Sequence, residues 1–301
     1  MPLWIPVTVA AALFQCWRTA MQQKLRHLLS VNGAGFVRYL YGVPTALVLL
    51  IVALQVSGAP LPEVNARFLV FCVCGGLSQI LATNLLIASF GYRNFAVGTA
   101  YGKTDTIQSA FIAMIFLHEY LRPLAWIGVV VGISGVMTLS LAGRGLKPRD
   151  LLAASVQPAA LCGLGAGFLL ACAAVFVKQI YLSLSGPDLF VRALFGLVVM
   201  NSMQTVAQGL WLIWREPGQV SKAFSSWRSS MWVGTLSACG SGLWATAFAL
   251  TDVALVRSVG QLELVFTLLF SRFYLKETLK RTDIAGLVLV VGGVLLIIST
   301  H

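Results

Sequence analysis

The sequence contains few charged residues for its length. Only 10% of its 301 residues are Asp, Glu, Lys or Arg, whereas a soluble domain carries about 25%. A soluble surface of this size must face water and would need more charge than the chain has. Hydrophobic residues instead make up 58% of the sequence. The composition therefore excludes a soluble globular protein and predicts one that crosses a membrane several times.

Residues for catalysis and metal binding are also scarce. The three histidines, His27, His118 and His301, are scattered over connections and the C-terminus. They do not form the cluster that an intramembrane metallohydrolase would need. No pairing of a nucleophile with a base is evident either. We therefore predict no catalytic residue, no metal ligand, no cofactor and no enzymatic activity.

The six cysteines do not suggest a disulfide framework or a zinc site. All of them fall within apolar runs, where a free cysteine behaves as a small hydrophobic residue. They are Cys16, Cys72, Cys74, Cys162, Cys172 and Cys239. The first apolar run, MPLWIPVTVAAALFQCW, lacks the basic region that begins a signal peptide. We expect this run to be retained as a helix.

A complete phosphate-binding loop is missing. The stretch GTAYGKT, which begins at Gly98, has three residues between its glycines, whereas the G-x-x-x-x-G-K-[ST] motif requires four. The stretch also lies in an apolar run and not between a strand and a helix. This excludes a nucleotide-driven pump, so any transport by this chain must use a gradient or an exchange.

Basic residues exceed acidic ones, with 21 Lys and Arg against 10 Asp and Glu. Most of the bases lie in short connections between apolar runs, where the positive-inside rule accounts for them. No polar domain remains that could bind DNA or RNA. We therefore expect the lipid bilayer and a small-molecule substrate as partners, and no nucleic acid. The sequence leaves a homodimer open.

Ten apolar runs are long enough to cross a bilayer, which takes roughly 20 residues. Their approximate limits are 3–22, 36–57, 68–90, 95–117, 123–143, 158–182, 189–213, 231–250, 253–274 and 283–299. The connections are too short to fold as separate soluble domains. The predicted fold is an all-α polytopic membrane protein with ten transmembrane helices.

The two halves of the chain repeat each other. The segment AVGTAYGKTDTIQSAFIAMIFLHEYLRPLAWIG, from Ala96, aligns with ALVRSVGQLELVFTLLFSRFYLKETLKRTDIAG, from Ala254. Their offset of 158 positions matches Asp105 with Glu263. The phrase FVRYLYG also returns as FVRALFG, with an offset of 154. We predict two five-helix repeats, 1–143 and 158–301, joined by a loop at 144–157.

An odd number of helices in each repeat has a geometric consequence. The second repeat must enter the membrane from the opposite side, so the two repeats are inverted. Many secondary transporters are built in this way, with a substrate site near the membrane midplane between the repeats. The pattern therefore favours a transporter.

The sequence resembles a known family at this point. FLHEYLRPLAWIGVVVGISG and YLKETLKRTDIAGLVLVVGG share an acid in a short polar turn, followed by spaced glycines. This pattern is similar to the EamA module of the drug/metabolite transporter superfamily. The resemblance implies ten helices in two modules, a transport function and a location in the inner (cytoplasmic) membrane. The module often has a proline thirteen residues before the glutamate, where this chain has Thr106 and Leu264.

Ionisable and polar residues inside the predicted helices are the candidate site, because such groups are costly in lipid and often mark a pathway. The candidate substrate-binding residues are Gln15, Arg18, Gln22, Arg38, Tyr101, Lys103, Lys178, Arg192, Trp244, Arg257 and Gln261, and the candidate proton carriers are Asp105 and Glu263. Bases outnumber acids in this set. The excess favours an anionic or carboxylate-bearing solute, with the aromatic rings stacking on it.

The spacing of these residues predicts which of them can pair. Gln15, Arg18 and Gln22 share one helix face, which either lines a cavity or bonds to a neighbouring helix. Lys103 and Asp105 are two residues apart and point to nearly opposite sides, so each needs a partner elsewhere. By the repeat, their counterparts are Gln261 and Glu263. One layer should line a cavity and the other brace the bundle.

Other polar residues have structural explanations of similar weight. Arg38 and Arg192, the arginines of the repeated phrase, open the second and seventh predicted spans and would reach lipid phosphate or a solute. Asn201, Gln204 and Gln208 form a polar face on the seventh span, as cavity lining or as contacts between helices. Glu119 and Glu277 lie in polar turns, where we expect them to cap the next helix.

The orientation in the membrane is predicted differently by two arguments. Bases concentrate in the odd-numbered connections, at Lys24, Arg26, Arg93, Arg144, Lys147, Arg149, Arg215, Lys222, Arg228, Lys276, Lys280 and Arg281, against Arg67 and Arg122 in the even-numbered ones. The positive-inside rule would place the odd connections in the cytoplasm and both termini outside it. The family resemblance implies both termini inside. The charge distribution is slightly favoured.

The sequence thus leads to one main hypothesis and two alternatives. The main hypothesis is a secondary transporter, an exporter of a small anionic or zwitterionic metabolite such as an amino acid, an amino-acid derivative or an opine-type metallophore. The alternatives are a flippase for a lipid intermediate and an integral membrane enzyme that acts on a lipid-linked substrate. The enzyme would need a catalytic set that the sequence does not show.

Overall fold

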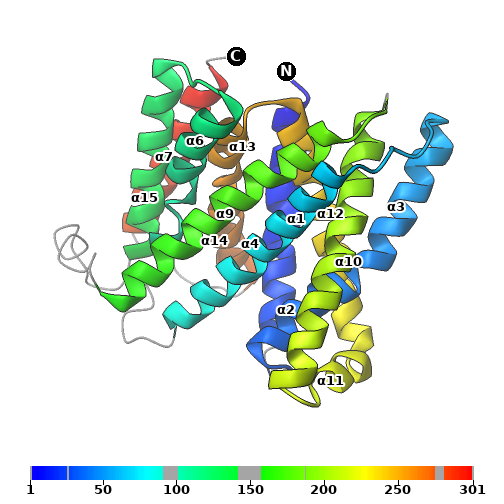
Figure 1. Ribbon diagram of the computed structural model, residues 1–301. Coiled ribbons are helices and arrows are strands. Elements are labelled where there is room, and N and C mark those ends of the chain that lie inside the picture. The colour runs from blue at the N-terminus through cyan, green and yellow to red at the C-terminus, as the bar shows by residue number, and fades with distance from the viewer. Residues whose placement is uncertain are drawn as a thin grey trace. The chain divides into compact units, whose positions relative to one another are not determined.

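The computed structural model describes residues 2–25, 27–90, 101–141, 157–186, 188–274 and 281–299. Within these ranges the regular secondary structure is entirely α-helical (Figure 1). The helices are α1 (Trp4–Leu25), α2 (Val31–Leu40), α3 (Gly42–Ser57), α4 (Ala66–Phe90), α6 (Asp105–Leu117), α7 (Pro123–Leu141), α9 (Pro158–Ser183), α10 (Leu189–Arg215), α11 (Gln219–Ser225), α12 (Trp227–Leu250), α13 (Val253–Gly260), α14 (Leu262–Tyr274) and α15 (Arg281–Ile298).

Several helices have the length and composition of membrane spans. Five qualify among the described residues: Val31–Ser57, Ala66–Leu86, Pro158–Ser183, Leu189–Arg215 and Trp227–Leu250. Shorter apolar helices cover Asp105–Phe116, Pro123–Leu139 and Thr282–Ile298. Large apolar side chains stay exposed on these helices, for example Val52, Leu210 and Leu295. Contiguous apolar surface of this kind suits contact with lipid, so the chain is a multi-pass membrane protein.

Local sequence signals explain where several helices begin and end. Pro123 and Pro158 occupy the first positions of α7 and α9, where a missing N–H costs nothing because no helical partner exists there. Asp188 caps α10 by accepting a hydrogen bond from the Val191 amide at 2.8 Å. Gly58 ends α3 with φ +62°, a left-handed conformation that glycine adopts without strain.

The second predicted span begins earlier than its sequence indicates. We predicted a start at residue 36. The helix α2 instead begins at Val31, since Ser30 caps it by accepting from the Gly33 amide at 3.1 Å. The glycines in this stretch allow close packing: a Cβ at Gly35 would lie 3.1 Å from Gln208 Nε2. A short break at Tyr41 separates α2 from α3.

The chain divides into two compact units. Unit 1 contains Met1–Ile5, Leu81–Val175 and Asp252–His301, and unit 2 contains Pro6–Ile80 and Phe176–Thr251. Unit 1 therefore combines the later part of each predicted repeat, and unit 2 combines the earlier parts. The predicted domains, 1–143 and 158–301, were defined by sequence likeness. Their boundaries therefore differ from those of the compact units, which are defined by packing. Most of the predicted loop, residues 144–156, lies outside the described residues.

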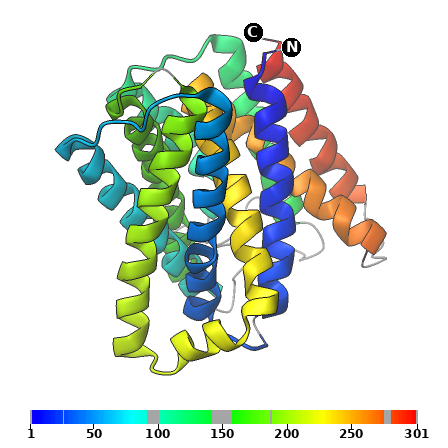
Figure 2. The same cartoon turned by 90° about the vertical axis from the view of Figure 1, so that its right-hand side faces the viewer.

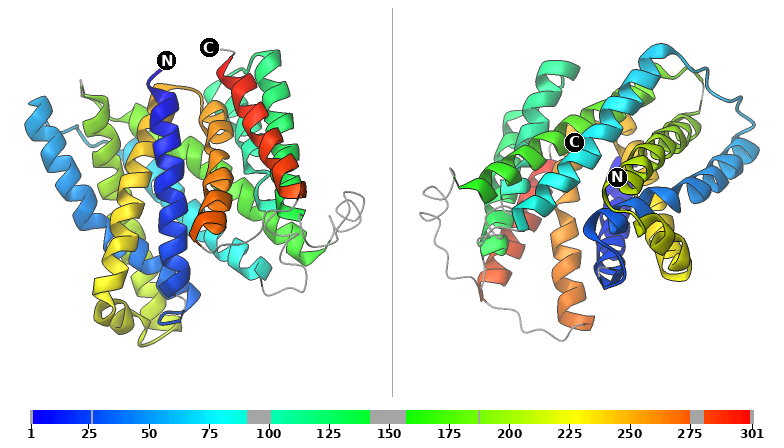
Figure 3. Two further views of the ribbon diagram at one scale, coloured as in Figure 1. Left: turned by 180° about the vertical axis from the view of Figure 1, so that it is seen from behind. Right: turned by 60° about the horizontal axis from the view of Figure 1, so that its bottom comes forward.

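Unit 2 is built on α2, α3, α10 and α12, with α1 beside α12 (Figure 3). One buried cluster includes Phe36, Val37, Leu212 and Val233. The chain turns from α10 through the short helix α11 into α12, as Figure 2 shows. Helix α11 lies in the connection between the predicted spans 189–213 and 231–250. The α10–α11 corner is held to α2 because Glu216 accepts hydrogen bonds from Ser30 and Asn32.

In unit 1, α7 and α15 form the most extensive helix pair (Figure 1). Their contact is made by glycines: a Cβ at Gly128 would lie 2.8 Å from the Gly293 carbonyl oxygen, and one at Gly135 would lie 2.7 Å from that of Gly286. As residue numbers rise along α7 they fall along α15, so the two helices are antiparallel. We call these four residues the glycine seam.

Candidate functional site

Two helical segments of unit 1 break at positions that the repeat makes equivalent. Lys103 and Thr104 form a turn before α6, and Gln261 forms the turn between α13 and α14. The 158-residue offset aligns Lys103 with Gln261. We had predicted continuous spans at 95–117 and 253–274, which is wrong at these breaks. A break leaves backbone groups without helical partners, and polar side chains gather at both turns.

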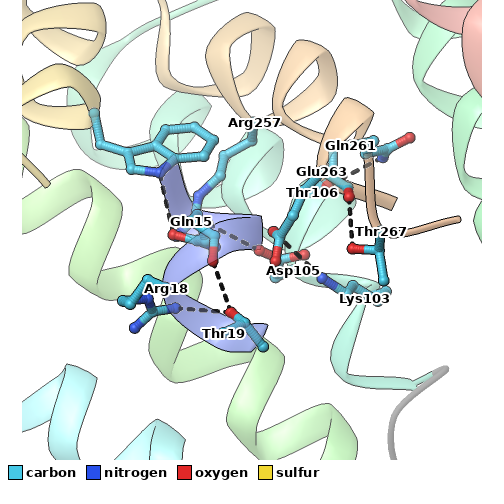
Figure 4. Close-up of polar contacts among 11 residues, drawn as sticks. Gln15, Arg18, Thr19, Lys103, Asp105, Thr106, Arg257, Gln261, Glu263 and Thr267 are labelled. Atoms are coloured by element: carbon cyan, nitrogen blue, oxygen red, sulfur yellow. Dashed lines mark hydrogen bonds and ion pairs between the residues drawn. The ribbon is translucent and has the colours of Figure 1, made fainter. Parts of the chain in front are cut away.

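The first pair at these breaks joins Asp105 to Arg257 (Figure 4). Asp105 is the first residue of α6 and is buried, with 8% of its surface exposed. Its Oδ2 lies 3.2 Å from Nη1 of Arg257 on α13. The guanidinium also donates through Nη2 to the carbonyl oxygen of Leu170 on α9, at 2.9 Å. The ion pair thus ties together three helices of the unit.

The second pair joins Lys103 to Glu263, with 3.8 Å between Nζ and Oε2 (Figure 4). Beside it, Gln261 donates through Nε2 to the Thr106 hydroxyl at 3.2 Å. Lys103 and Asp105 therefore bind different partners, as their two-residue spacing predicts. Each of the two acids of the site faces one base, so its formal charges balance.

Small residues give these side chains their space. A Cβ at Gly167 of α9 would lie 3.0 Å from the Gly102 carbonyl oxygen and 3.3 Å from the Asp105 amide nitrogen. A Cβ at Gly132 of α7 would lie 2.6 Å from Gln261 Oε1. Glycine at these two positions lets α9 approach the first break and leaves room for the amide at the second. These glycines therefore have a structural role, because they let neighbouring helices approach closely.

Unit 2 contains a small pocket formed by α1, α2 and α12. Its lining residues are Gln15, Arg18, Arg38, Leu236, Ser237, Gly240 and Ser241. Arg38 donates through Nε to the hydroxyl of the buried Ser237 at 2.8 Å. Since α2 begins at Val31, Arg38 lies in the second turn of its helix and does not open the span, contrary to our prediction.

The polar stripe of α1 serves both purposes that its spacing allows. Gln15 Oε1 accepts from the indole Nε1 of Trp244 at 3.2 Å, and Trp244 stacks on Phe248. Arg18 lines the pocket and contacts Thr19 at 3.4 Å (Figure 4). Gln22, one turn further on, donates to the Ala34 carbonyl oxygen at 2.7 Å. The stripe therefore combines pocket lining with contacts to neighbouring helices.

Three of the predicted candidates occupy other places. Lys178 donates to the carbonyl oxygen of Thr251, the C-terminal cap of α12, at 2.7 Å, where a cation suits the helix dipole. Arg192 donates to the Tyr181 hydroxyl at 2.8 Å and covers that ring. The Tyr101 carbonyl oxygen accepts from the Thr104 hydroxyl at 2.6 Å, within the turn before α6.

The polar face of α10 holds helices together. Gln204 donates to the Gly76 carbonyl oxygen at 3.2 Å and to Gln79 Oε1 at 3.0 Å. Gln208 donates to the Asn32 carbonyl oxygen at 3.2 Å. Both glutamines are buried. These contacts match the interhelical alternative that the sequence left open.

Sequence reasoning missed some residues of the two sites. Ser237 and Ser241 lie on α12 among small apolar residues, and only their four-residue spacing marks a common face. Sequence reasoning also gave no indication of the contact between Glu119 and α13. The Glu119 Oε2 accepts at 2.8 Å from the Val253 amide, at the start of α13. The predicted equivalent, Glu277, lies outside the described residues.

Metal binding has no support in the described part of the chain. No group of three or more His, Cys, Asp or Glu side chains there could hold an ion. The contacts at both sites are instead ion pairs and hydrogen bonds between helices.

Comparison with known proteins finds a similarity to one family in the second half of the chain. Residues 157–299 match the EamA-like transporter family. A solved crystal structure with 16% sequence identity covers 97% of this chain and 99% of its own, with a TM-score of 0.67. At that identity the likeness concerns the fold alone. A search of curated proteins found no match. Through residues 157–299, the chain is therefore similar to the EamA-like transporter family.

Proposed function

We propose that the protein is a secondary transporter, driven by a gradient or by exchange, that exports a small anionic or zwitterionic metabolite. Amino acids, amino-acid derivatives and opine-type metallophores belong to this class. The observation that carries the proposal is the pair Asp105–Arg257, a buried carboxylate and a guanidinium whose side chain is only 16% exposed, at a break between membrane helices. Burying two charges costs several kcal/mol of desolvation per ion, which a purely structural contact does not require.

The ion pairs suggest how solute and proton could be coupled. A proton on Asp105 or Glu263 removes the negative charge that balances Arg257 or Lys103. An anionic solute can then neutralise the exposed base in place of the carboxylate. Release of the proton restores the ion pair and displaces the solute. The two acids are thus the proposed proton carriers, and bases are available to receive an anion.

The helix packing supports ten helices in two inverted repeats. The 158-residue offset makes α7 the counterpart of α15, since Pro123 aligns with Arg281, where each helix begins. These counterparts are antiparallel along the glycine seam. A rotation by 180° that places each helix on the other exchanges Gly128 with Gly286 and Gly135 with Gly293. The contact Gly128–Gly293 then becomes the contact Gly135–Gly286, and the reverse. Two repeats that run in opposite senses account for this arrangement.

Transport in vesicles tests the proposal. The purified protein would be placed in vesicles that contain a pH-sensitive dye, with amino acids and opine-type compounds supplied as solutes. We expect solute-dependent proton movement that Asp105→Asn or Glu263→Gln abolishes. Glu63→Gln, a change in an exposed acid outside the helices, is the matched control and should keep wild-type flux. Full activity in both site variants would remove the proposed proton carriers.

A further inference from the structure

The connection between α10 and α12 concentrates exposed tryptophans. Four of the five exposed tryptophans of the chain lie at the two helix ends that it joins: Trp211, Trp214, Trp227 and Trp232. Arg215 ends one candidate membrane span and Trp227 begins the next one (Figure 2). Tryptophan favours the boundary between lipid and water, because its ring is apolar and its N–H group is polar. We therefore expect this surface at the level of the lipid headgroups, and we call residues 211–232 the basic patch.

The bases of the basic patch have no acceptor in the described part of the protein. Arg215, Lys222 and Arg228 are exposed, and none of their side chains makes a hydrogen bond or an ion pair to a described residue. The one acid of the patch is Glu216. Its carboxylate is committed elsewhere, because it accepts hydrogen bonds from two side chains at the start of α2. The patch therefore presents positive charge that the described residues do not neutralise.

Aromatic rings hold two of these bases in defined places. The Cζ of Arg215 lies 4.0 Å from the centroid of the Trp214 ring, and the Cζ of Arg228 lies 5.6 Å from that of the Trp227 ring. A guanidinium over a ring is attracted by the negative face of the ring, and its N–H donors form a fork that matches two oxygens of a phosphate. The two arginines can therefore bind an anion while they keep their contacts to the rings.

An arginine near the opposite end of α10 shows the contrast. The Cζ of Arg192 lies 4.3 Å from the centroid of the Tyr181 ring, and the guanidinium also donates to the Tyr181 hydroxyl and to the Leu184 carbonyl oxygen. The protein itself supplies acceptors for this base. Arg215 lies over a ring in the same way but meets no acceptor among the described residues. The lack of an acceptor, and not the ring contact, therefore distinguishes the basic patch.

We propose that the basic patch binds the headgroup of an anionic phospholipid. Charge and position select this occupant: the three bases attract the phosphate, and the four exposed indoles contact the lipid around it. A zwitterionic lipid fits less well, because its own cation lies next to its phosphate. Each base near the headgroups strengthens the binding of an anionic lipid by about fivefold, so three bases give a preference of about a hundredfold. This lipid site does not depend on the proposed transport.

Lipid titration of the full-length protein tests the assignment. The protein, purified in a neutral detergent, would be titrated with phosphatidylglycerol and separately with phosphatidylcholine of the same acyl chains, and native mass spectrometry would count the bound lipids. We expect the first phosphatidylglycerol to bind about a hundredfold more tightly than the first phosphatidylcholine. This comparison needs no variant. Equal affinities would overturn the proposal and leave the bases to an acidic protein partner.

Variants locate the bound lipid. Arg215→Gln should reduce the preference by about fivefold, and Arg228→Gln added to it should leave a preference of only about fivefold. Arg67→Gln is the matched control for the single change. Arg67 is also exposed and lies over a ring, that of Phe71 at 5.6 Å, but no other base lies between residues 58 and 80. A full preference in the double variant, or an equal loss in Arg67→Gln, would overturn the proposal.

Thermal unfolding provides a second measurement on the same samples. The substituted side chains are exposed, so the variants should unfold at the wild-type temperature when no lipid is added. A ligand that binds only the folded state raises this temperature. Phosphatidylglycerol should therefore raise it more in the wild type than in the double variant, and phosphatidylcholine should act equally on both. An equal rise with phosphatidylglycerol in both proteins would contradict a lipid site at the basic patch.

Discussion

At the scale of single residues, Asp105 and Arg257 depend on each other. Their side chains are 12% and 16% exposed, so either charge alone would remain in a poorly solvated place. The contact to the Leu170 carbonyl oxygen compensates only part of the charge of Arg257. The free energy of unfolding should therefore respond more strongly to the loss of one partner than to the loss of both.

Single and double substitutions measure this dependence. Arg257→Gln should lower the free energy of unfolding by about 3–5 kcal/mol, because it leaves a buried carboxylate unpaired. Asp105→Asn added to it should restore much of the loss. Thermal unfolding in detergent, analysed as a double-mutant cycle, gives the coupling. Additive effects of the two changes would contradict an ion pair that holds the helices.

A second prediction concerns Glu119 and the start of α13. The carboxylate accepts from the Val253 amide, one of the first N–H groups of a helix, which have no helical partner. Glu119→Ala should therefore cost about 0.5–2 kcal/mol, the usual range for a lost N-terminal cap. Faster hydrogen exchange at the start of α13 would locate the effect. Unchanged exchange there would argue against a capping role.

The spacing of residues predicted some of these contacts but not their partners. Lys103 and Asp105 could be separated onto two faces because a helix turns by a fixed angle per residue. Their partners, Glu263 and Arg257, come from segments more than 150 positions away, and local periodicity contains no information about such contacts. Arg38 and Arg192 lie in the same repeated phrase of sequence. The sequence around them therefore does not reveal that their surroundings differ.

At the scale of helices, the glycine seam explains how α7 and α15 approach so closely. A Cβ at Gly293 would lie 2.5 Å from the Gly132 backbone nitrogen and 2.6 Å from the Gly128 carbonyl oxygen. Backbone atoms cannot rotate away as a flexible side chain can. The next residue, Gly292, has nothing within 4 Å of the same added atom. The two neighbours therefore provide a matched comparison.

Alanine should destabilise the protein at Gly293 but not at Gly292. Gly293→Ala forces the helices apart and should lower the free energy of unfolding by about 1–3 kcal/mol, as overpacking does. Gly292→Ala should be neutral or stabilise by up to about 1 kcal/mol, because alanine favours the helix. Thermal unfolding of the two purified variants in one detergent checks this. A similar loss in both would mean that the seam is not the close contact described.

Most helices could be predicted from the sequence, but their interruptions could not. Long apolar runs predicted α4, α9, α10 and α12 within a few residues, because bilayer thickness requires such runs. The breaks at Lys103 and Gln261 occur without proline. They are accompanied by contacts from other helices, such as the approach of Gly167 and the space left by Gly132, so they depend on packing.

At the scale of the whole molecule, the repeat in the sequence and the compact units divide the chain differently. Sequence likeness predicts repeats at residues 1–143 and 158–301. Packing instead joins the later parts of both predicted repeats in unit 1 and the earlier parts in unit 2. Each compact unit therefore draws on both predicted repeats, and we expect neither of them alone to form either unit.

The distribution of bases predicts the orientation of the chain. The odd-numbered connections, which contain residues such as Lys24, Arg149 and Lys222, should face the cytoplasm, with both termini outside it. Reporter proteins fused to the N-terminus and after Ser226 would test this, since the two sites should report opposite sides. A cytoplasmic N-terminus would show that the family pattern outweighs the charge distribution.

The glycine seam also has an evolutionary consequence. A contact that a half-turn leaves unchanged does not depend on which copy contributes which helix. Two copies of one half-length ancestor, inserted with opposite orientations, would have met through the same surface before its gene was duplicated and fused. The glycines would then have been fixed early, when a single codon change altered both sides of the interface at once.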